Sequence, residues 1–306
     1  MSPDILVPLL AATVQSGTPI LFATLGAICS EKSGVLNLGV EGAMALGALA
    51  AFAITFYTGS PWLGFLAGGL SGVLMGGIHG LVCLGFLGNQ VVSGLALTIL
   101  GVGLANYLGT PLIGQNADGF SAVAVPLLSK LPIFGPVFFN QDPLVYISYL
   151  IPIVLWLFFQ NTRAGLRLRS VGENPDAASA AGINPVSYRW LGVLGGGFFM
   201  GLGGAYLSLA YTHMWANHLS AGRGWIAVAL VIFAFWNPLR AVSGAYLFGG
   251  VMAFQFRLQA SGTHIPSSFL LMLPYALTLI VLVFSSWKGS NVATPQALGT
   301  NIEPAD

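Results

Sequence analysis

The stretch that decides the fold of this chain is Gln160-Asn-Thr-Arg-Ala-Gly-Leu-Arg-Leu-Arg-Ser-Val-Gly-Glu-Asn-Pro-Asp-Ala-Ala-Ser-Ala-Ala-Gly-Ile-Asn-Pro-Val-Ser-Tyr-Arg189. It is the one long charged loop between apolar segments. It holds four of the ten Lys and Arg residues and two of the nine Asp and Glu residues. A charged loop in such a chain has to lie in water, so we expect it to contact a soluble partner on one side of a membrane.

The composition indicates a membrane protein. Only 6% of the 306 residues are charged, 56% are hydrophobic, and the mean hydropathy is +0.83. A soluble domain has about 25% charged residues. Apolar runs of about 18 residues or more, enough to cross a bilayer as a helix, recur along the chain. They are continuous, whereas a membrane β-barrel has short alternating segments. The net charge of +1 gives no reason to expect a nucleic-acid partner. The sequence therefore predicts an all-α polytopic membrane protein.

We expect one transmembrane domain over residues 1–306, with about nine spans (eight to ten). The seventh is short enough to be a half-helix. The predicted spans are 5–28, 37–57, 62–87, 91–108, 144–160, 188–212, 224–236, 240–258 and 267–287.

The basic residues predict the orientation. If the 161–187 loop is cytoplasmic, seven of the ten basic residues lie inside, in agreement with the positive-inside rule. The N-terminus is then outside, and residues 288–306 form a flexible cytoplasmic tail. Segment 109–143 becomes an outer loop, in which three prolines disfavour a regular helix. The seven inner basic residues are Lys32, Arg163, Arg167, Arg169, Arg189, Arg240 and Lys288.

Two glycine-rich polar segments precede apolar runs and resemble interrupted helices. One is Ser30–Gly42 on the inner side, and the other is Ser220–Ala229 on the outer side. Such a pair is typical of a transporter built from two inverted-topology halves, with a binding site near the midplane. The alternative is that both are ordinary ends of glycine-rich spans.

The charged loop contains signals for a short helix. Asn174 is a preferred N-cap, Pro175 suits the first helical position, and Asp176 suits the helix dipole. Ala177–Ala181 continue the helix, and Gly182 ends it in the left-handed conformation. A helix of about seven residues is marginal in water, so we expect it to fit a groove of another protein. An interfacial helix without a partner is the alternative.

The run Gly172–Ile183 resembles the coupling-helix loop of permease subunits of bacterial ABC importers. Within the branched-chain amino acid, ribose and simple-sugar permease family, Ser33–Gly42 resembles the branch that imports nucleosides and related sugars. The resemblance covers residues 15–287 and includes three further short motifs. These are Pro126–Ser129, Phe139–Gln141 and Gly222–Gly224.

This resemblance implies a fold like that of the vitamin B12 permease and a multi-pass protein of the bacterial plasma membrane. It implies three protein partners: a cytoplasmic ABC ATPase that binds the ATP, a second, related permease chain, and a solute-binding protein outside. It also implies that residues of the 161–187 loop couple the permease to the ATPase, namely Glu173, Asn174, Pro175, Asp176, Ala177, Ala178 and Gly182.

The sequence gives no sign of catalysis. It has no G-x-x-x-x-G-K-[ST] phosphate loop, so we expect no ATP hydrolysis and no cofactor in this chain. No spacing of His, Cys, Asp or Glu suggests a metal site.

Four residues are candidates for the solute pathway. Glu41 is the one acid that we expect inside a span, where a carboxylate is costly unless it is paired or faces a cavity. We expect Asn37 one turn earlier on the same helical face. The pair could bind ribose hydroxyls or base edges, or Glu41 could accept backbone N–H groups at Ser33-Gly34. Trp225 and Phe233 could stack on a base, although Trp225, like Arg223, could equally anchor a helix end.

The expected function is therefore import of a nucleoside by alternating access. A neutral sugar such as ribose or galactose is the alternative. A water or glycerol channel is disfavoured because Asn174-Pro175 lies in the charged loop and Asn237-Pro238 lies at an inner end, so neither of these pairs starts an apolar half-helix. An ion-driven transporter is disfavoured because Glu41 alone is too little ionisable chemistry for coupling.

Overall fold

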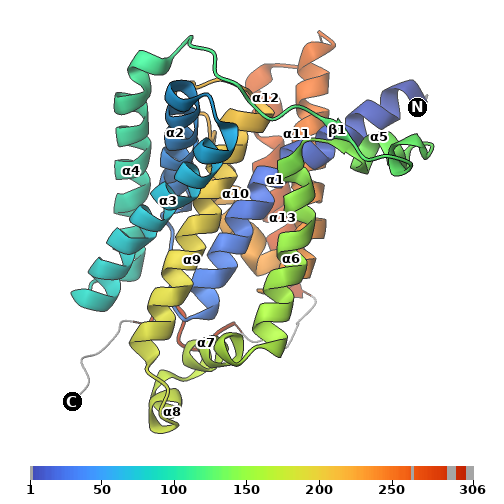
Figure 1. The fold of residues 1–306 in the computed structure, drawn as a ribbon. Helices are drawn as coiled ribbons and strands as arrows, with labels where there is room; N and C mark the ends of the chain where they lie inside the picture. The colour runs from blue at the N-terminus through green and yellow to red at the C-terminus, as the bar shows by residue number, and fades with distance from the viewer. Residues whose placement is uncertain (1–2, 263–264, 288–293, 301–306) are drawn as a thin grey trace.

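The computed structural model describes residues 3–262, 265–287 and 294–300, and helices make up most of it. Figure 1 shows the long helices side by side in one bundle, with α1 and α9 near its centre. The long helices and the half-length α10 are α1 (Pro3–Lys32), α2 (Val40–Thr58), α3 (Pro61–Gly80), α4 (Gln90–Gly109), α6 (Pro143–Asn161), α9 (Pro185–Tyr206), α10 (Arg223–Phe233), α11 (Pro238–Ala260) and α13 (Leu273–Trp287).

Shorter elements extend or connect these helices. Two π-helical turns continue α3 and α9, and two 3-10 turns and a two-stranded sheet lie between α4 and α6. The sheet pairs Val123 with Gln141 and Ala124 with Asn140, antiparallel. The short elements are η1 (Leu81–Gly85), η2 (Thr110–Leu112), β1 (Val123–Ala124), η3 (Leu128–Lys130), α5 (Phe134–Phe138), β2 (Asn140–Gln141), α7 (Arg163–Glu173), α8 (Pro175–Ala180), η4 (Leu207–Tyr211) and α12 (Ser267–Leu271).

Each predicted span corresponds to a helix, but not every helix is long and apolar enough to cross a membrane. Among the described residues, six stretches meet that standard: α1, α2, α3 with η1, α4 with η2, α6, and α9 with η4. The apolar helix α10 has 11 residues, in line with the half-helix expected at the seventh span. The chain is thus a polytopic helical membrane protein.

Asn-Pro and Asp-Pro pairs start several helices, for the reason that the sequence suggests. Asp142 accepts hydrogen bonds from the N–H groups of Leu144 and Val145 at the start of α6. Asn184 and Asn237 cap α9 and α11 in the same manner, and a proline follows each cap. The side-chain oxygen satisfies an N–H that lacks an intrahelical partner, and proline has no N–H to lose.

Glycines let the central helices approach closely. Gly47 of α2 and Gly68 of α3 both lie against Gly201 of α9, where any side chain would collide with backbone. Gly72 of α3 likewise lies against the backbone of α9, and Gly249 of α11 against that of α1. Close backbone contact through small residues is how helices gain packing energy in lipid, where apolar burial alone contributes little.

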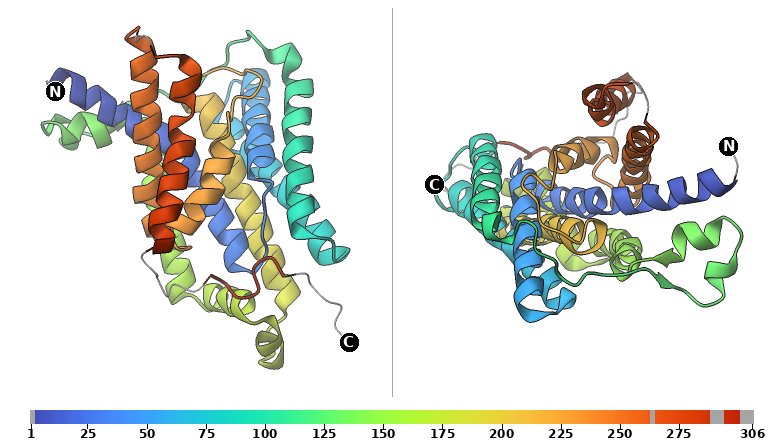
Figure 2. Two further views of the ribbon diagram at one scale, coloured as in Figure 1. Left: turned by 180° about the vertical axis from the view of Figure 1, so that it is seen from behind. Right: turned by 90° about the horizontal axis from the view of Figure 1, so that it is seen from above.

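The two ends of the bundle differ in content. Segment 110–142, which the prolines predicted to be irregular, lies at one end, and α7 and α8 lie at the other (Figure 1). The views in Figure 2 show α4 at one edge and α11 with α13 at another.

The described part of the C-terminal segment is packed at the α7 end. The N–H of Ala297 donates to the carbonyl of Gly172 at 3.0 Å, and Gln90 Nε2 donates to the carbonyl of Thr300 at 2.8 Å. The sequence predicts a flexible tail over 288–306, and two of the residues described there, Ala297 and Thr300, are hydrogen-bonded to the bundle. Residues 288–293, with Lys288, and 301–306 lie outside the described residues.

Candidate functional site

Glu41 is the polar centre of the bundle. Its side chain is 7% exposed and accepts three hydrogen bonds from the segment that begins α10. Ser220 Oγ and the N–H of Gly222 donate to Oε1 at 2.6 and 2.8 Å, and the N–H of Gly224 donates to Oε2 at 2.7 Å. The sequence suggested that Glu41 could accept backbone N–H groups at Ser33-Gly34. Glu41 does accept backbone N–H groups, but they belong to the segment that begins α10.

Glu41 lies where two helices start. It occupies the first turn of α2, and its three donors lie at the start of α10. In Figure 1 the two helices extend from this point in opposite directions, α2 upward and α10 downward. The first N–H groups of a helix have no intrahelical acceptor and carry a partial positive charge. One carboxylate therefore stabilises the start of both helices.

Each of these helices is preceded by a non-helical segment. We call Ser33–Gly39, between α1 and α2, the first linker, and Thr212–Gly222, between η4 and α10, the second linker. They were expected on opposite faces of the membrane. The structure brings their ends together at Glu41.

Side chains of α3 and α4 hold the first linker. Gln90 Oε1 accepts from the N–H of Leu36 at 2.7 Å, and Thr98 Oγ1 donates to the carbonyl of Leu38 at 2.8 Å. His79 Nε2 lies 2.9 Å from the carbonyl of Leu36, and its Nδ1 lies 3.0 Å from Ser93 Oγ. Because a carbonyl only accepts, Nε2 carries the proton and Nδ1 accepts from the Ser93 hydroxyl. His79 thus links α3 to α4 and to the first linker.

Arg223 is the cation nearest to this centre. It is 4% exposed, its Nη1 donates to the carbonyls of Leu219 and Ser220, and its guanidinium lies 5.4 Å from the Tyr211 ring centre. The Tyr211 hydroxyl in turn lies 3.1 Å from Ser16 Oγ. Arg223 Nε is buried and has no hydrogen-bond partner among the described residues. A buried N–H of this kind needs an acceptor.

The four pathway candidates do not form one cluster. Asn37 lies in the first linker, outside α2, and its Oδ1 accepts from the N–H of Gly39 at 2.8 Å. The prediction that Asn37 shares a helical face with Glu41 is therefore wrong. Trp225 follows Gly224 and is 39% exposed. Phe233 lies at the far end of α10 beside Gly244 of α11. Of the three, only Trp225 directly follows a hydrogen-bond partner of Glu41, Gly224.

A second acid, Glu31, is also buried, and the sequence did not predict it. Glu31, in the last turn of α1, is 3% exposed, and its Oε2 accepts from Trp236 Nε1 at 2.6 Å. The expectation that Glu41 is the one acid inside a span is thus incomplete. A carboxylate in the final turn of a long apolar helix was the available signal, because such a group needs a partner when buried.

The charged loop contains two helices, of which only the second was predicted. The buried residues of α7 (Gly165, Leu168, Val171 and Gly172) recur at helical spacing, a signal that the sequence contained. In α8, Asn174 Oδ1 accepts from the N–H of Ala177 at 2.9 Å, and Gly182 has φ 78°. Ala178 is 4% exposed because it faces its own chain. The exposed surface of α8 is therefore formed by its neighbours, including Asp176, Ala177 and Ala180.

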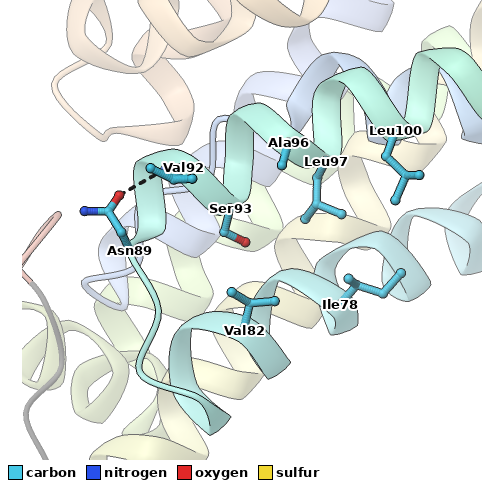
Figure 3. Close-up of a pocket in the computed structure, with 8 residues that line it drawn as sticks. All are labelled: Ile78, Val82, Asn89, Val92, Ser93, Ala96, Leu97 and Leu100. Atoms are coloured by element: carbon cyan, nitrogen blue, oxygen red, sulfur yellow. Dashed lines mark hydrogen bonds between the residues drawn. The ribbon is translucent and has the colours of Figure 1, made fainter.

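An apolar groove of about 630 Å³ lies between α3 with η1 and α4. Figure 3 shows Ile78, Val82, Leu97 and Leu100 lining it, and Asn89 bonded to its own helix at Val92. Because its lining is mostly aliphatic, the groove suits an apolar neighbour better than a solute rich in hydroxyl groups.

The chain is similar to known permeases over most of its length. A family model described as the branched-chain amino acid transport system / permease component matches residues 9–282. The nucleoside ABC transporter permease NupC of Lactococcus lactis is 36% identical, with 93% of each chain covered. The guanosine ABC transporter permease NupQ of Bacillus subtilis is 32% identical, with 91% of each covered.

A Haloferax volcanii protein provisionally named a glucose ABC transporter permease is 43% identical, over 82% of this chain and 78% of that protein. No solved structure matches the chain. The family model spans most of the helices, including α2, α10 and the loop that contains α8. The chain belongs to the family of permease components of the branched-chain amino acid transport system, and its relatives include ABC transporter permeases named for nucleosides.

Proposed function

We propose that the chain is the membrane permease subunit of an ATP-driven nucleoside importer. The support is the likeness to NupC and NupQ over more than nine-tenths of each chain. A cytoplasmic ABC ATPase, a second permease chain and a solute-binding protein on the opposite side complete the importer. The ATP is bound by the ATPase, and the chain lies in the plasma membrane with its N-terminus outside and its C-terminus in the cytoplasm.

The charges near the bundle centre favour a neutral solute. Glu41 is fully engaged by α10, and Arg223 already donates to two carbonyls. A phosphate would need more positive charge than one engaged guanidinium supplies. The buried Arg223 Nε needs a single acceptor, such as a base nitrogen, a carbonyl or a hydroxyl. This donor is the observation that carries the choice of a neutral, hydrogen-bonding solute.

We propose that the bundle is built from two inverted halves with nine spans in total, like the vitamin B12 permease. One half contains α1, the first linker and α2–α4, and the other contains α9, the second linker, α10, α11 and α13. The ninth span, α6, lies between the two halves in the chain. The helix contacts support this arrangement. Gly72 of α3 packs on α9 as Gly249 of α11 packs on α1.

Cysteine labelling tests the orientation. Ser129 lies between α4 and α6, and Ser179 lies in α8, at the other end of the bundle. With a membrane-impermeant thiol reagent, Ser129→Cys should be labelled from outside and Ser179→Cys only after the membrane is opened. Labelling of both from one side would contradict the topology.

A substitution on α8 tests the coupling role. Ala180 is exposed on α8, so Ala180→Arg adds a long side chain to the surface that would contact the ATPase without filling the core. We expect insertion to persist and uptake to fall strongly. Ala180→Ser is the matched control and should transport normally. Normal uptake by Ala180→Arg would remove α8 from the coupling surface.

A competition assay tests the solute. In cells that lack this chain and regain it from a plasmid, excess unlabelled guanosine, adenosine or uridine should abolish the uptake of labelled nucleoside. Excess ribose, galactose or glucose should leave it unchanged. The second candidate function is import of a simple neutral sugar, which the 43% identical relative favours. Competition by a sugar and not by nucleosides would establish that alternative.

A further inference from the structure

The hydrogen bond between Glu31 and Trp236 joins α1 to the turn between α10 and α11. Both side chains are buried, at 3% and 7% exposure, and the two atoms are 2.6 Å apart. A hydrogen bond to a carboxylate contributes more than one between neutral groups. The two ends of α10 are thus both held by carboxylates from the segment 31–41: Glu41 at its start and Glu31 just beyond its end.

The turn that contains Trp236 has a strained backbone. Phe235 and Trp236 have φ values of 50° and 53°, and both are bulky residues in the left-handed region. Such a conformation is unfavourable and persists only when its surroundings enforce it. The contacts that enforce it here include the Glu31 bond and the stacking of Arg240 on Phe235, whose ring centre lies 5.5 Å from the guanidinium. Loss of the Glu31 bond would allow the turn to relax.

The same end of α1 contacts the helix that precedes α8. Gly172 of α7 lies so close to the carbonyl of Lys32 that a side chain would collide with it. A displacement of α7 would therefore directly shift the last turn of α1, in which Glu31 lies.

We propose that Glu31 and Trp236 are positioning residues that transmit motion of α8 to α10. The route runs from α8 through Gly172 to the end of α1, from Glu31 to Trp236, and along α10 to Glu41. The inference rests on the proposed ATP-driven function, since α8 is moved by the ATPase. In it, α10 moves as a short rigid helix, and the strained turn at Phe235 and Trp236 is the hinge that changes conformation.

The test uses the full importer complex in proteoliposomes, with nucleoside uptake and ATP hydrolysis measured on the same sample. Trp236→Phe keeps an aromatic ring and loses the N–H donor. We expect it to lower uptake per ATP hydrolysed by about tenfold, the effect of losing one hydrogen bond to a carboxylate. Glu31→Gln keeps an acceptor oxygen and should retain most of the ratio. Trp62→Phe, an exposed tryptophan on α3, is the matched control.

The double variant Glu31→Ala with Trp236→Phe adds a second criterion. Because both substitutions remove one shared bond, it should be no worse than either single variant. A wild-type ratio in Trp236→Phe would overturn the proposal. If that variant does not assemble, the ratio of uptake to ATP hydrolysis is measured in Glu31→Ala instead, and a wild-type ratio there would overturn the proposal. A wild-type complex that couples no nucleoside uptake to ATP would instead refute the proposed function, and the two failures are therefore distinguishable.

Discussion

The two linkers both end at Glu41, but they are built differently. In the first, Leu36 is bonded on both its N–H and its carbonyl, and Leu38 on its carbonyl, all by side chains of α3 and α4. The second is bound by Glu41, by Asn106, whose Oδ1 accepts from the N–H of His218, and by Arg223, which donates to the carbonyls of Leu219 and Ser220. The ring of His213 in this linker also lies 3.1 Å, through Nε2, from the carbonyl of Phe120. This linker also contains non-glycine residues with positive φ: His213, His218 and Ala221.

This difference indicates which part of the molecule can move. The first linker has several independent bonds to neighbouring helices, so losing one leaves the others in place. At the end of the second, one carboxylate accepts all three hydrogen bonds that join α10 to α2. The second also holds a strained backbone, which is typical of switch regions. We therefore assign the first linker and α4 to a fixed frame, and the second linker and α10 to the mobile part.

The largest effect should come from Glu41→Ala. Three buried donors would lose their acceptor, and each unsatisfied group costs about 1–3 kcal/mol. We expect uptake to be abolished and the melting temperature of the purified chain to fall by several degrees. Glu41→Gln keeps an acceptor oxygen and should recover part of both. Uptake close to wild type in Glu41→Ala would show that the second linker does not depend on this carboxylate.

The next largest difference is expected between two glycines, Gly224 at the start of α10 and Gly39 at the start of α2. A Cβ on Gly224 would lie 2.5 Å from the Glu41 Cα, so Gly224→Ala has to push α10 away from α2. A Cβ on Gly39 would meet mainly side chains, with the Leu97 Cβ at 3.3 Å. Overpacking against backbone costs about 1–3 kcal/mol. Uptake should therefore fall by about tenfold in Gly224→Ala and by much less in Gly39→Ala. Equal losses would erase the distinction between the two linkers.

The sequence predicts the local features of this arrangement and not its long-range contacts. Asn174, Asn184 and Gly182 act where the sequence places them because caps and left-handed glycines depend on the nearest residues. The partner of Glu41 could not be read in this way, since Ser220 is 179 residues away. Its chemistry was predictable, because a buried carboxylate needs donors. Helical periodicity placed Asn37 on α2, but side chains of α3 and α4 bind the backbone of Leu36 and Leu38, and this segment is not helical.

A small effect should follow from Thr98→Val. This change removes one of several bonds to the first linker while keeping the shape of the side chain, at a cost of about 1 kcal/mol. The melting temperature should fall slightly, and uptake should remain within about twofold of wild type. Thr278→Val, whose hydroxyl donates only to its own helix at Pro274, is the control. A collapse of uptake in Thr98→Val alone would mean that the first linker is no more robust than the second.

A disulfide between the first linker and α4 tests most directly whether the first linker stays fixed during transport. A Cβ on Gly39 would lie 3.3 Å from that of Leu97, close to the 3.5–4.5 Å that a disulfide requires. The variant Gly39→Cys with Leu97→Cys is reconstituted with its partners, and ATP-driven nucleoside uptake is measured after oxidation and again after reduction. Because the frame does not move, we predict equal uptake in both states. Uptake that stops on oxidation and returns on reduction would show that the first linker moves during transport, and would contradict the account.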